Sequence, residues 1–309
     1  MTEPLRGVIA PNLTPFEQSG EVAYDLYVGH VKRLLEQGCV GVAPFGTTGE
    51  ALSVGMGERI VMLETLLSEG VDPARMIPGT GLTNLADTTR LTRRAVEMGC
   101  AGAMVLPPFY FKDAPDDGLF AYFARLIDAV GHDVLRIYLY HIPQVSGVGI
   151  PVEVVQRLRE AFPDQIVGIK DSSGDWENTR RLLTEVDGLI VYPGSELPLL
   201  EALELGAPGC ISATANINAA AIAAVIQAWE EGRRGEAQEL HEKARALRLT
   251  VQGYAPIPAQ KRLLALWSGD ERWAAVQPPL LPMSPEKGRE LADVLAREHE
   301  LGAVPVGAA

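Results

Sequence analysis

The chain has 309 residues, of which 47% are hydrophobic, enough for a large core without disulfides or structural metals. A formal net charge of -13 argues against nucleic-acid and anionic membrane partners, since binding to both depends on Lys and Arg. The sequence shows no signal peptide and no run near the roughly 20 apolar residues of a membrane span, so we expect a cytoplasmic protein.

Three cysteines occur, none of them in a C-x-x-C pair: Cys39, Cys100 and Cys210. An odd count without paired spacing predicts buried thiols rather than a disulfide framework or a zinc site. Five scattered histidines likewise form no ligand cluster, which disfavours a metal-dependent enzyme. We therefore expect no metal.

Short β-rich runs alternate with longer helical patterns, as parallel β/α units require. The expected strands span residues 7–13, 39–45, 76–80, 101–106, 134–140, 165–170, 189–192 and 209–212. The helices between them are expected at 21–36, 58–68, 85–98, 118–130, 151–161, 178–185 and 197–205. This alternation predicts an α/β protein with a (β/α)8 TIM barrel fold.

The chain from 219 to 300 is different, because it is a series of helical patterns with proline-rich joints and has no strand pattern. We expect one structural unit, with the barrel over 1–230, a C-terminal helical extension packed on it over 231–300, and a flexible tail over 301–309.

Active sites of such barrels lie at the carboxyl ends of the strands, so polar residues there are the first candidates. They are the Gly46-Thr47-Thr48-Gly49-Glu50 turn, Tyr140, Lys170, Gly194-Ser195-Glu196 and Ser212. We expect these positions to converge on one mouth.

Lys170 is the one lysine that ends an apolar strand. The other five occur in polar or helical surroundings and are expected to be solvated: Lys32, Lys112, Lys243, Lys261 and Lys287. Loss of hydration at a strand end favours an uncharged amine, which can attack a ketone and form an iminium. A structural ion pair with Asp171 or another carboxylate is the alternative, and position alone leaves both open.

Tyr140, one strand earlier, could move protons to and from the carbinolamine. His141 should face the opposite side of the strand, which favours a packing or hydrogen-bonding role. The glycines of the Gly46–Glu50 turn permit tight geometry, and the amides of Thr47 and Thr48 could bind a carboxylate. Glu50 is more plausible as a cap or buried anchor than as a general base.

These residues belong to motifs that, in combination, are typical of one family. The chain resembles the dihydrodipicolinate synthase / N-acetylneuraminate lyase superfamily of class I, pyruvate-using lyases. The motifs are GTTGE at 46–50, PPFY at 107–110, YHIP at 140–143, GIKD at 168–171 and GAPGCISATAN at 206–216.

The resemblance implies a role for each matching position. Lys170 is similar to the Schiff-base lysine, Tyr140 to the proton-shuttling phenol, and Thr47 and Thr48 to the pair that holds the substrate carboxylate and continues the relay. Tyr110 is similar to an aromatic residue that reaches into a neighbouring subunit's site. The family is typically tetrameric, which implies a homotetramer built as a dimer of dimers.

The departures from the family pattern concern the second substrate. Dihydrodipicolinate synthases usually carry a carboxylate-binding arginine where this chain has Val145, and valine offers neither charge nor donors. The SGV at 146–148 is closer to the neuraminate-lyase branch. That branch's acidic pair is only half present, as Glu196 before Leu197, and Ala213 replaces its later serine.

The prediction is a class I lyase acting on pyruvate or a 2-keto acid, as an aldolase or dehydratase for a 2-keto-3-deoxy sugar acid. It needs no cofactor beyond the covalent imine to Lys170, and Gly46, Gly194, Glu196 and Ser212 would help bind substrate. One alternative is 4-hydroxy-tetrahydrodipicolinate synthase, which joins pyruvate and aspartate semialdehyde. The other is a catalytically silent 2-keto-acid-binding protein.

Overall fold

The structure is a computed structural model that describes residues 4–302. The fold divides into two compact units. Among the described residues, one comprises Asp72–Ile211 with residues 4–7, and the other comprises Val8–Val71 with residues 212–302. The predicted boundary between a barrel and a helical extension at 230/231 stays a prediction, and most of the predicted tail (303–309) lies outside the described residues.

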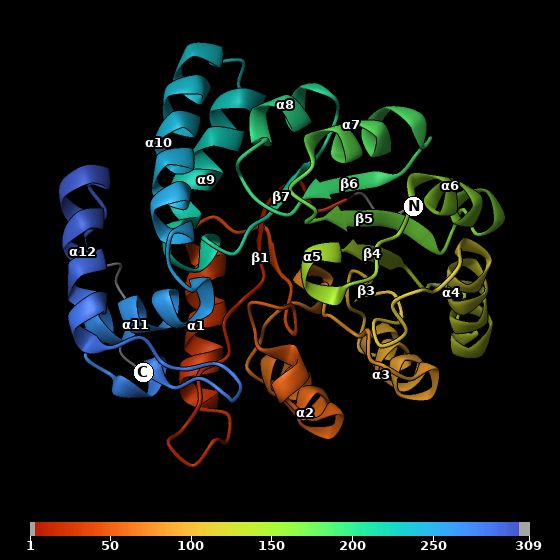
Figure 1. The fold of residues 1–309 in the computed structure, drawn as a ribbon, viewed down its shortest axis with the longest axis horizontal. Helices are drawn as coiled ribbons and strands as arrows, with labels where there is room; N and C mark the ends of the chain where they lie inside the picture. The colour runs from red at the N-terminus through yellow and green to blue at the C-terminus, as the bar shows by residue number, and fades with distance from the viewer. Residues whose placement is uncertain (1–3, 303–309) are drawn as a thin grey trace. The chain divides into compact units, whose positions relative to one another are not determined.

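A parallel four-stranded sheet with the order β3-β4-β5-β6 forms the centre of the first unit (Figure 1). The strands are β3 (Ala103–Val105), β4 (Ile137–His141), β5 (Ile166–Asp171) and β6 (Ile190–Pro193), and β7 (Gly209–Ile211) follows later in the chain. The helices are α3 (Leu85–Glu97), α4 (Asp116–Val130), α5 (Pro143–Ser146), α6 (Val152–Ala161), α7 (Trp176–Glu185) and α8 (Leu199–Glu204), with the 3-10 turn η2 (Pro73–Arg75) before them.

Strand alternation decides which side chains of this sheet face the helices. Ile137 and Leu139 of β4 belong to a buried apolar cluster with Phe123 of α4 and Leu158 of α6. Since successive side chains of a strand point to opposite faces, Tyr138 and Tyr140 lie on the other face. The apolar face of the sheet therefore packs against the helices, and the opposite face carries Tyr138 and Tyr140.

The strand predicted over 76–80 is wrong. The structure has only an isolated parallel bridge between Gly79 and Met104 in its place. The amide of Met104 donates to the carbonyl of Pro78 over 2.8 Å, and the amide of Thr80 donates to the carbonyl of Met104 over 2.9 Å. Pro78 has no amide hydrogen to donate, which shortens the ladder to this bridge.

The second unit contains β1 (Gly7–Ala10) from Val8 onward, and the last residues of this strand pair in parallel with β2 (Gly41–Val42). Its helices are α1 (Tyr24–Glu36), α2 (Met56–Ser68), α9 (Ala215–Glu230), α10 (Arg234–Gln252), α11 (Pro256–Ser268) and α12 (Pro285–His299), with the 3-10 turns η1 (Ala51–Ser53) and η3 (Glu271–Ala274). Leu247, Leu263, Trp273 and Leu291 join α10, α11, η3 and α12 in one apolar cluster.

Candidate active site

The carboxyl ends of β4 and β5 bring two polar side chains together on the face away from the helices. Tyr140 and Lys170 are register partners in this parallel pair. The Nζ atom of Lys170 lies 3.5 Å from the Oη atom of Tyr140 and 4.5 Å from the centre of its ring. Both side chains are buried, Lys170 at 4% and Tyr140 at 3% exposure. An amine and a phenol thus share one desolvated position.

Asp171 does not neutralise this amine, so the ion-pair alternative for Lys170 is wrong. Alternation turns the Asp171 carboxylate to the helix side of β5. There its Oδ2 atom accepts hydrogen bonds from Thr179 Oγ1 at 2.7 Å and from Asn178 Nδ2 at 3.0 Å, and Oδ1 accepts one from the Ser173 amide at 2.9 Å. Across residues 4–302, Lys170 forms no ion pair with any carboxylate.

His141 has the structural role that the sequence favours. Its Nδ1 atom accepts a hydrogen bond from the amide of Ile150 at 2.9 Å. Burial lowers the pKa of His141, and the charge of Asp171 opposes that shift only in part. The neutral imidazole of His141, whose Nδ1 atom accepts this hydrogen bond, therefore holds the segment after α5 against β4.

The ends of β5 and β6 approach each other closely at Gly194. The amide of Gly194 donates to the carbonyl of Asp171 over 2.6 Å. A Cβ atom at this position would overlap Ser172 Oγ and lie 2.7 Å from Ser172 Cα, so only glycine fits. Glu196, two residues later, is fully buried before α8.

The Gly46–Glu50 turn lies in the second unit, where it follows β2. The amide of Gly49 donates to the carbonyl of Gly46 and that of Glu50 donates to the carbonyl of Thr47, both over 3.1 Å. Thr48 is buried, and Glu50 has the left-handed backbone angle φ of 51°. Two successive hydrogen-bonded turns therefore fix the backbone around the two threonines.

Neighbouring backbone holds this turn from behind. Thr14 Oγ1 donates to the carbonyl of Gly49 over 2.8 Å. A Cβ atom on Gly49 would lie 2.8 Å from the carbonyl oxygen of Asn12, so this glycine is required by close approach.

A buried ion pair completes the anchor. Lys261 Nζ of α11 lies 2.6 Å from Glu50 Oε1 and donates to the carbonyl of Thr14 at 2.8 Å, while the amide of Gln277 donates to Glu50 Oε2 at 2.7 Å. The interpretation of Glu50 as a buried anchor is confirmed. The expectation that Lys261 is solvated is wrong, because the side chains of Lys261 and Glu50 are 0% and 1% exposed.

Ser212 is also buried and belongs to the second unit. Its amide donates to the carbonyl of Ile9 over 3.2 Å, and its hydroxyl lies 3.1 Å from Thr214 Oγ1. Arg248 Nη1 donates to the same hydroxyl at 3.2 Å. The sequence did not reveal this contact of Ser212, because Arg248 is one of many charged residues of helix α10.

Tyr110 is separate from the Lys170 pair. It lies on the connection between β3 and α4, is 73% exposed, and packs edge-to-face on the equally exposed Phe111 with ring centres 5.4 Å apart. Lys112 supports this connection by donating to the carbonyl of Ser146 at 2.7 Å. The connection thus displays two aromatic rings to solvent.

Three further properties of the described residues bear on the kind of protein. Within residues 4–302 no three or more His, Cys, Asp and Glu side chains are grouped as a metal ion would need. No helix in that range has both the length and the apolar composition of a membrane span. No disulfide joins the three cysteines; Cys39 and Cys210 are buried as predicted, whereas Cys100, also expected to be buried, is half-buried.

Known proteins match nearly the whole chain. Residues 4–298 match the sequence model of the Dihydrodipicolinate synthetase family. An uncharacterized DapA-like lyase of Chloroflexus aurantiacus is 38% identical over 288 residues, covering 93% of this chain and 94% of that protein. A 4-hydroxy-tetrahydrodipicolinate synthase of Thermus thermophilus is 36% identical, covering 94% of this chain and 96% of that protein.

Solved structures agree. The dihydrodipicolinate synthase of Agrobacterium tumefaciens superposes with a TM-score of 0.85 at 34% identity, covering 94% of this chain and 98% of that chain. The fold is therefore the predicted TIM barrel with a helical C-terminal part, and the protein is a class I lyase that works through a lysine Schiff base. The chain belongs to the Dihydrodipicolinate synthetase family.

Proposed function

We propose that this lyase cleaves or dehydrates a 2-keto-3-deoxy sugar acid through an imine on Lys170. The observation that carries the proposal is the buried amine 3.5 Å from the Tyr140 hydroxyl, with the adjacent carboxylate of Asp171 committed elsewhere. The amine attacks the ketone carbon C2, and loss of water from the carbinolamine gives the iminium. Electrons from a breaking bond at C3–C4, or from C3–H before hydroxide leaves C4, flow into that iminium.

Tyr140 supplies the proton transfers in this scheme. Its hydroxyl protonates the departing carbinolamine oxygen and takes the proton back when the imine is hydrolysed. Burial excludes bulk water from the pair, which strengthens the hydrogen bond between them.

The GTTGE motif supports the roles proposed for the turn. Thr47 continues the proton relay, and Thr48 with the backbone at Gly46 binds the substrate carboxylate. The two hydrogen-bonded turns and the Glu50 anchor support this proposal, because carboxylate binding needs amides and hydroxyls in a fixed arrangement.

The remaining proposed contacts concern the distal part of the substrate and the assembly. Gly194, Glu196 and Ser212 line the region beyond C3, and Tyr110 reaches the site of a neighbouring subunit in a homotetramer that works in the cytoplasm. The exposed aromatic pair of Tyr110 and Phe111 supports the assembly, because exposed apolar groups favour contact with a partner.

A second candidate function, that of a 4-hydroxy-tetrahydrodipicolinate synthase, is supported by one relative. The Thermus thermophilus relative is a 4-hydroxy-tetrahydrodipicolinate synthase by name, which favours condensation of pyruvate with aspartate semialdehyde. Against it stands Val145, which is 61% exposed on α5 and offers no donor to a second carboxylate.

A paired assay separates these candidates. Wild-type protein is incubated with 2-keto-3-deoxy sugar acids while both the release of pyruvate and the consumption of the sugar acid are followed, so that cleavage and dehydration are each detected. It is incubated separately with pyruvate and aspartate semialdehyde in a coupled assay. We expect turnover of the sugar acids that is lost in Lys170→Ala. Turnover only in the assay with pyruvate and aspartate semialdehyde would establish the synthase. Binding of pyruvate without turnover in either assay would establish the silent binding protein.

A further inference from the structure

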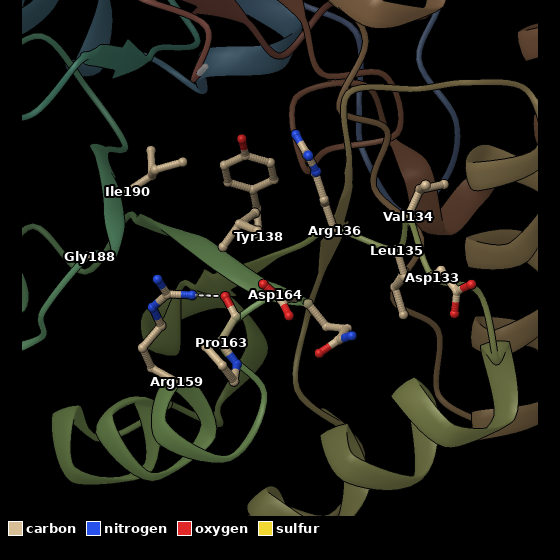
Figure 2. Close-up of a pocket in the computed structure, with 12 residues that line it drawn as sticks. Asp133, Val134, Leu135, Arg136, Tyr138, Arg159, Pro163, Asp164, Gly188 and Ile190 are labelled. Carbon is tan, nitrogen blue, oxygen red and sulfur yellow. Dashed lines mark hydrogen bonds between the residues drawn. The ribbon is translucent and has the colours of Figure 1, made fainter. Parts of the chain in front are cut away.

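A cavity opens at the amino-terminal ends of β4, β5 and β6. It has a volume of about 460 Å³ and is lined by residues at or just before the amino-terminal ends of β4, β5 and β6 (Figure 2). Tyr140 and Lys170 stand near the carboxyl ends of those strands. This cavity is therefore distinct from the candidate active site, and its volume is in the range of small-molecule sites.

Tyr138 provides a fixed phenol in this cavity. The residue is 4% exposed, and its ring lies between two glycines. A Cβ atom on Gly102 would lie 2.7 Å from Tyr138 Cε2, and one on Gly168 would lie 2.6 Å from Cδ1. Since no larger residue fits at either glycine, the sheet is shaped to hold this ring in one orientation.

The hydroxyl of Tyr138 is available to a ligand. Within residues 4–302 it has no hydrogen-bond partner, whereas the neighbouring phenol of Tyr192 donates to the carbonyl of Leu5 over 2.7 Å. Burial raises the pKa of Tyr138 to about 12, and the charge of Arg136 opposes this only in part. Near neutral pH the phenol therefore keeps its proton, and it can donate a hydrogen bond to a ligand in the cavity.

Arg136 adds a cation to the same cavity. Its guanidinium is half-buried and, in the part of the chain that the structure describes, forms no ion pair or hydrogen bond. Figure 2 shows the Arg136 and Tyr138 side chains next to each other, with their polar ends extending in the same direction. A planar fork of N–H donors beside an O–H donor matches the geometry of an oxyanion.

The other charged groups of the cavity form neither an ion pair nor a hydrogen bond with the guanidinium of Arg136. Arg159 donates to the backbone carbonyls of Pro163, Ile166 and Asp187, so it builds the wall (Figure 2). Asp133 and Asp164 are exposed at the rim, where water and salt screen their charge. The half-buried guanidinium is screened less.

We propose that this cavity is a binding site for a small organic acid or phosphate ester, whose oxyanion accepts hydrogen bonds from Arg136 and Tyr138. The ligand's remaining atoms occupy the cavity between the amino-terminal ends of β4, β5 and β6. The site is independent of the reaction proposed at Lys170.

Calorimetric titration of three probes tests this site. The probes are succinate, inorganic phosphate and the uncharged succinamide, each added to Lys170→Ala protein so that imine formation contributes nothing. We expect saturable binding of succinate or phosphate and none of succinamide. The anion that binds identifies the ligand class as carboxylate or phosphate.

Three further variants locate the binding. Arg136→Gln should weaken it about tenfold or more, as expected for loss of a charge-assisted hydrogen bond, and Tyr138→Phe should weaken it several-fold. Arg157→Gln is the matched control, since Arg157 is an exposed arginine on α6 that pairs with Asp117 outside the cavity. Saturable binding that Arg136→Gln leaves unchanged, or the absence of binding by either anion, overturns the proposal.

Discussion

Replacing Lys261 by methionine tests the anchor of the Gly46–Glu50 turn. The variant keeps the length of the side chain but removes the ammonium group, and Glu50 stays buried with the Gln277 amide as its remaining donor. Removing one partner of a buried ion pair leaves an uncompensated charge and destabilises by about 3–5 kcal/mol. We apply this range because the two side chains are 0% and 1% exposed.

Urea unfolding at pH 7 measures this effect against a matched pair. Lys32 and Glu69 form an ion pair of 3.1 Å with side chains 43% and 51% exposed, so Lys32→Met should change the free energy of unfolding by at most about 1 kcal/mol. Adding Glu50→Gln to Lys261→Met should restore part of the loss, because it removes the buried charge. Equal effects of Lys261→Met and Lys32→Met would refute the reasoning.

The same pair predicts a dependence on pH. Burial lowers the pKa of Lys261 to about 8, although the charge of Glu50 opposes the shift. Between this value and about 10.4 in the unfolded chain, the unfolded state binds more protons, so the contribution of Lys261 to stability rises with pH. The difference in unfolding free energy between wild type and Lys261→Met should therefore increase above pH 8. A difference that shrinks there would contradict the direction of the shift.

The remaining predictions concern acid stability, a strand contact and substrate choice. Burial and the charge of Arg33 hold the pKa of His30 well below its usual value. The stability that the neutral imidazole contributes should therefore fall as the pH drops below about 6.5. Urea unfolding of His30→Gln should show a smaller loss of unfolding free energy over the same pH range than wild type. Gly194→Ala places a methyl group against Ser172, and thermal unfolding should show a loss of about 1–3 kcal/mol together with lower lyase activity. Val145→Arg should raise turnover with aspartate semialdehyde relative to wild type and to Val145→Lys, because a planar guanidinium binds a carboxylate better than an ammonium group does. Equal rates in all three proteins would refute a role for position 145 in binding the second carboxylate.

Local patterns account for what could be predicted from the sequence. Lys170 and Tyr140 each close an apolar run of residues, and parallel pairing of neighbouring strands places their side chains on one face. Alternation also predicted the separate orientation of His141 correctly. These two predictions depend only on the alternation of side chains along a strand and on the order of strands along the chain. Both can be read from short segments of the sequence.

Features that depend on contacts between distant segments were missed. Lys261 occurs in a helix whose residues from Pro258 to Ala265 are all buried, and only its distant partner Glu50 explains a lysine there. A signal was present, because a glutamate expected as a buried anchor requires a cation or donors. The cavity at Tyr138 depends on the ring fitting between Gly102 and Gly168, which no pattern within a single segment reveals.

Borohydride trapping with pyruvate is the direct test of imine formation on Lys170. Wild-type protein is reduced in the presence of pyruvate, digested, and examined by mass spectrometry for the peptide that carries the added mass. We expect an adduct on Lys170 and none on Lys261. Lys261 is the natural competitor because it is also buried and burial lowers its pKa to about 8. An adduct on Lys261, or none on Lys170 in protein that turns over its substrate, would contradict the account.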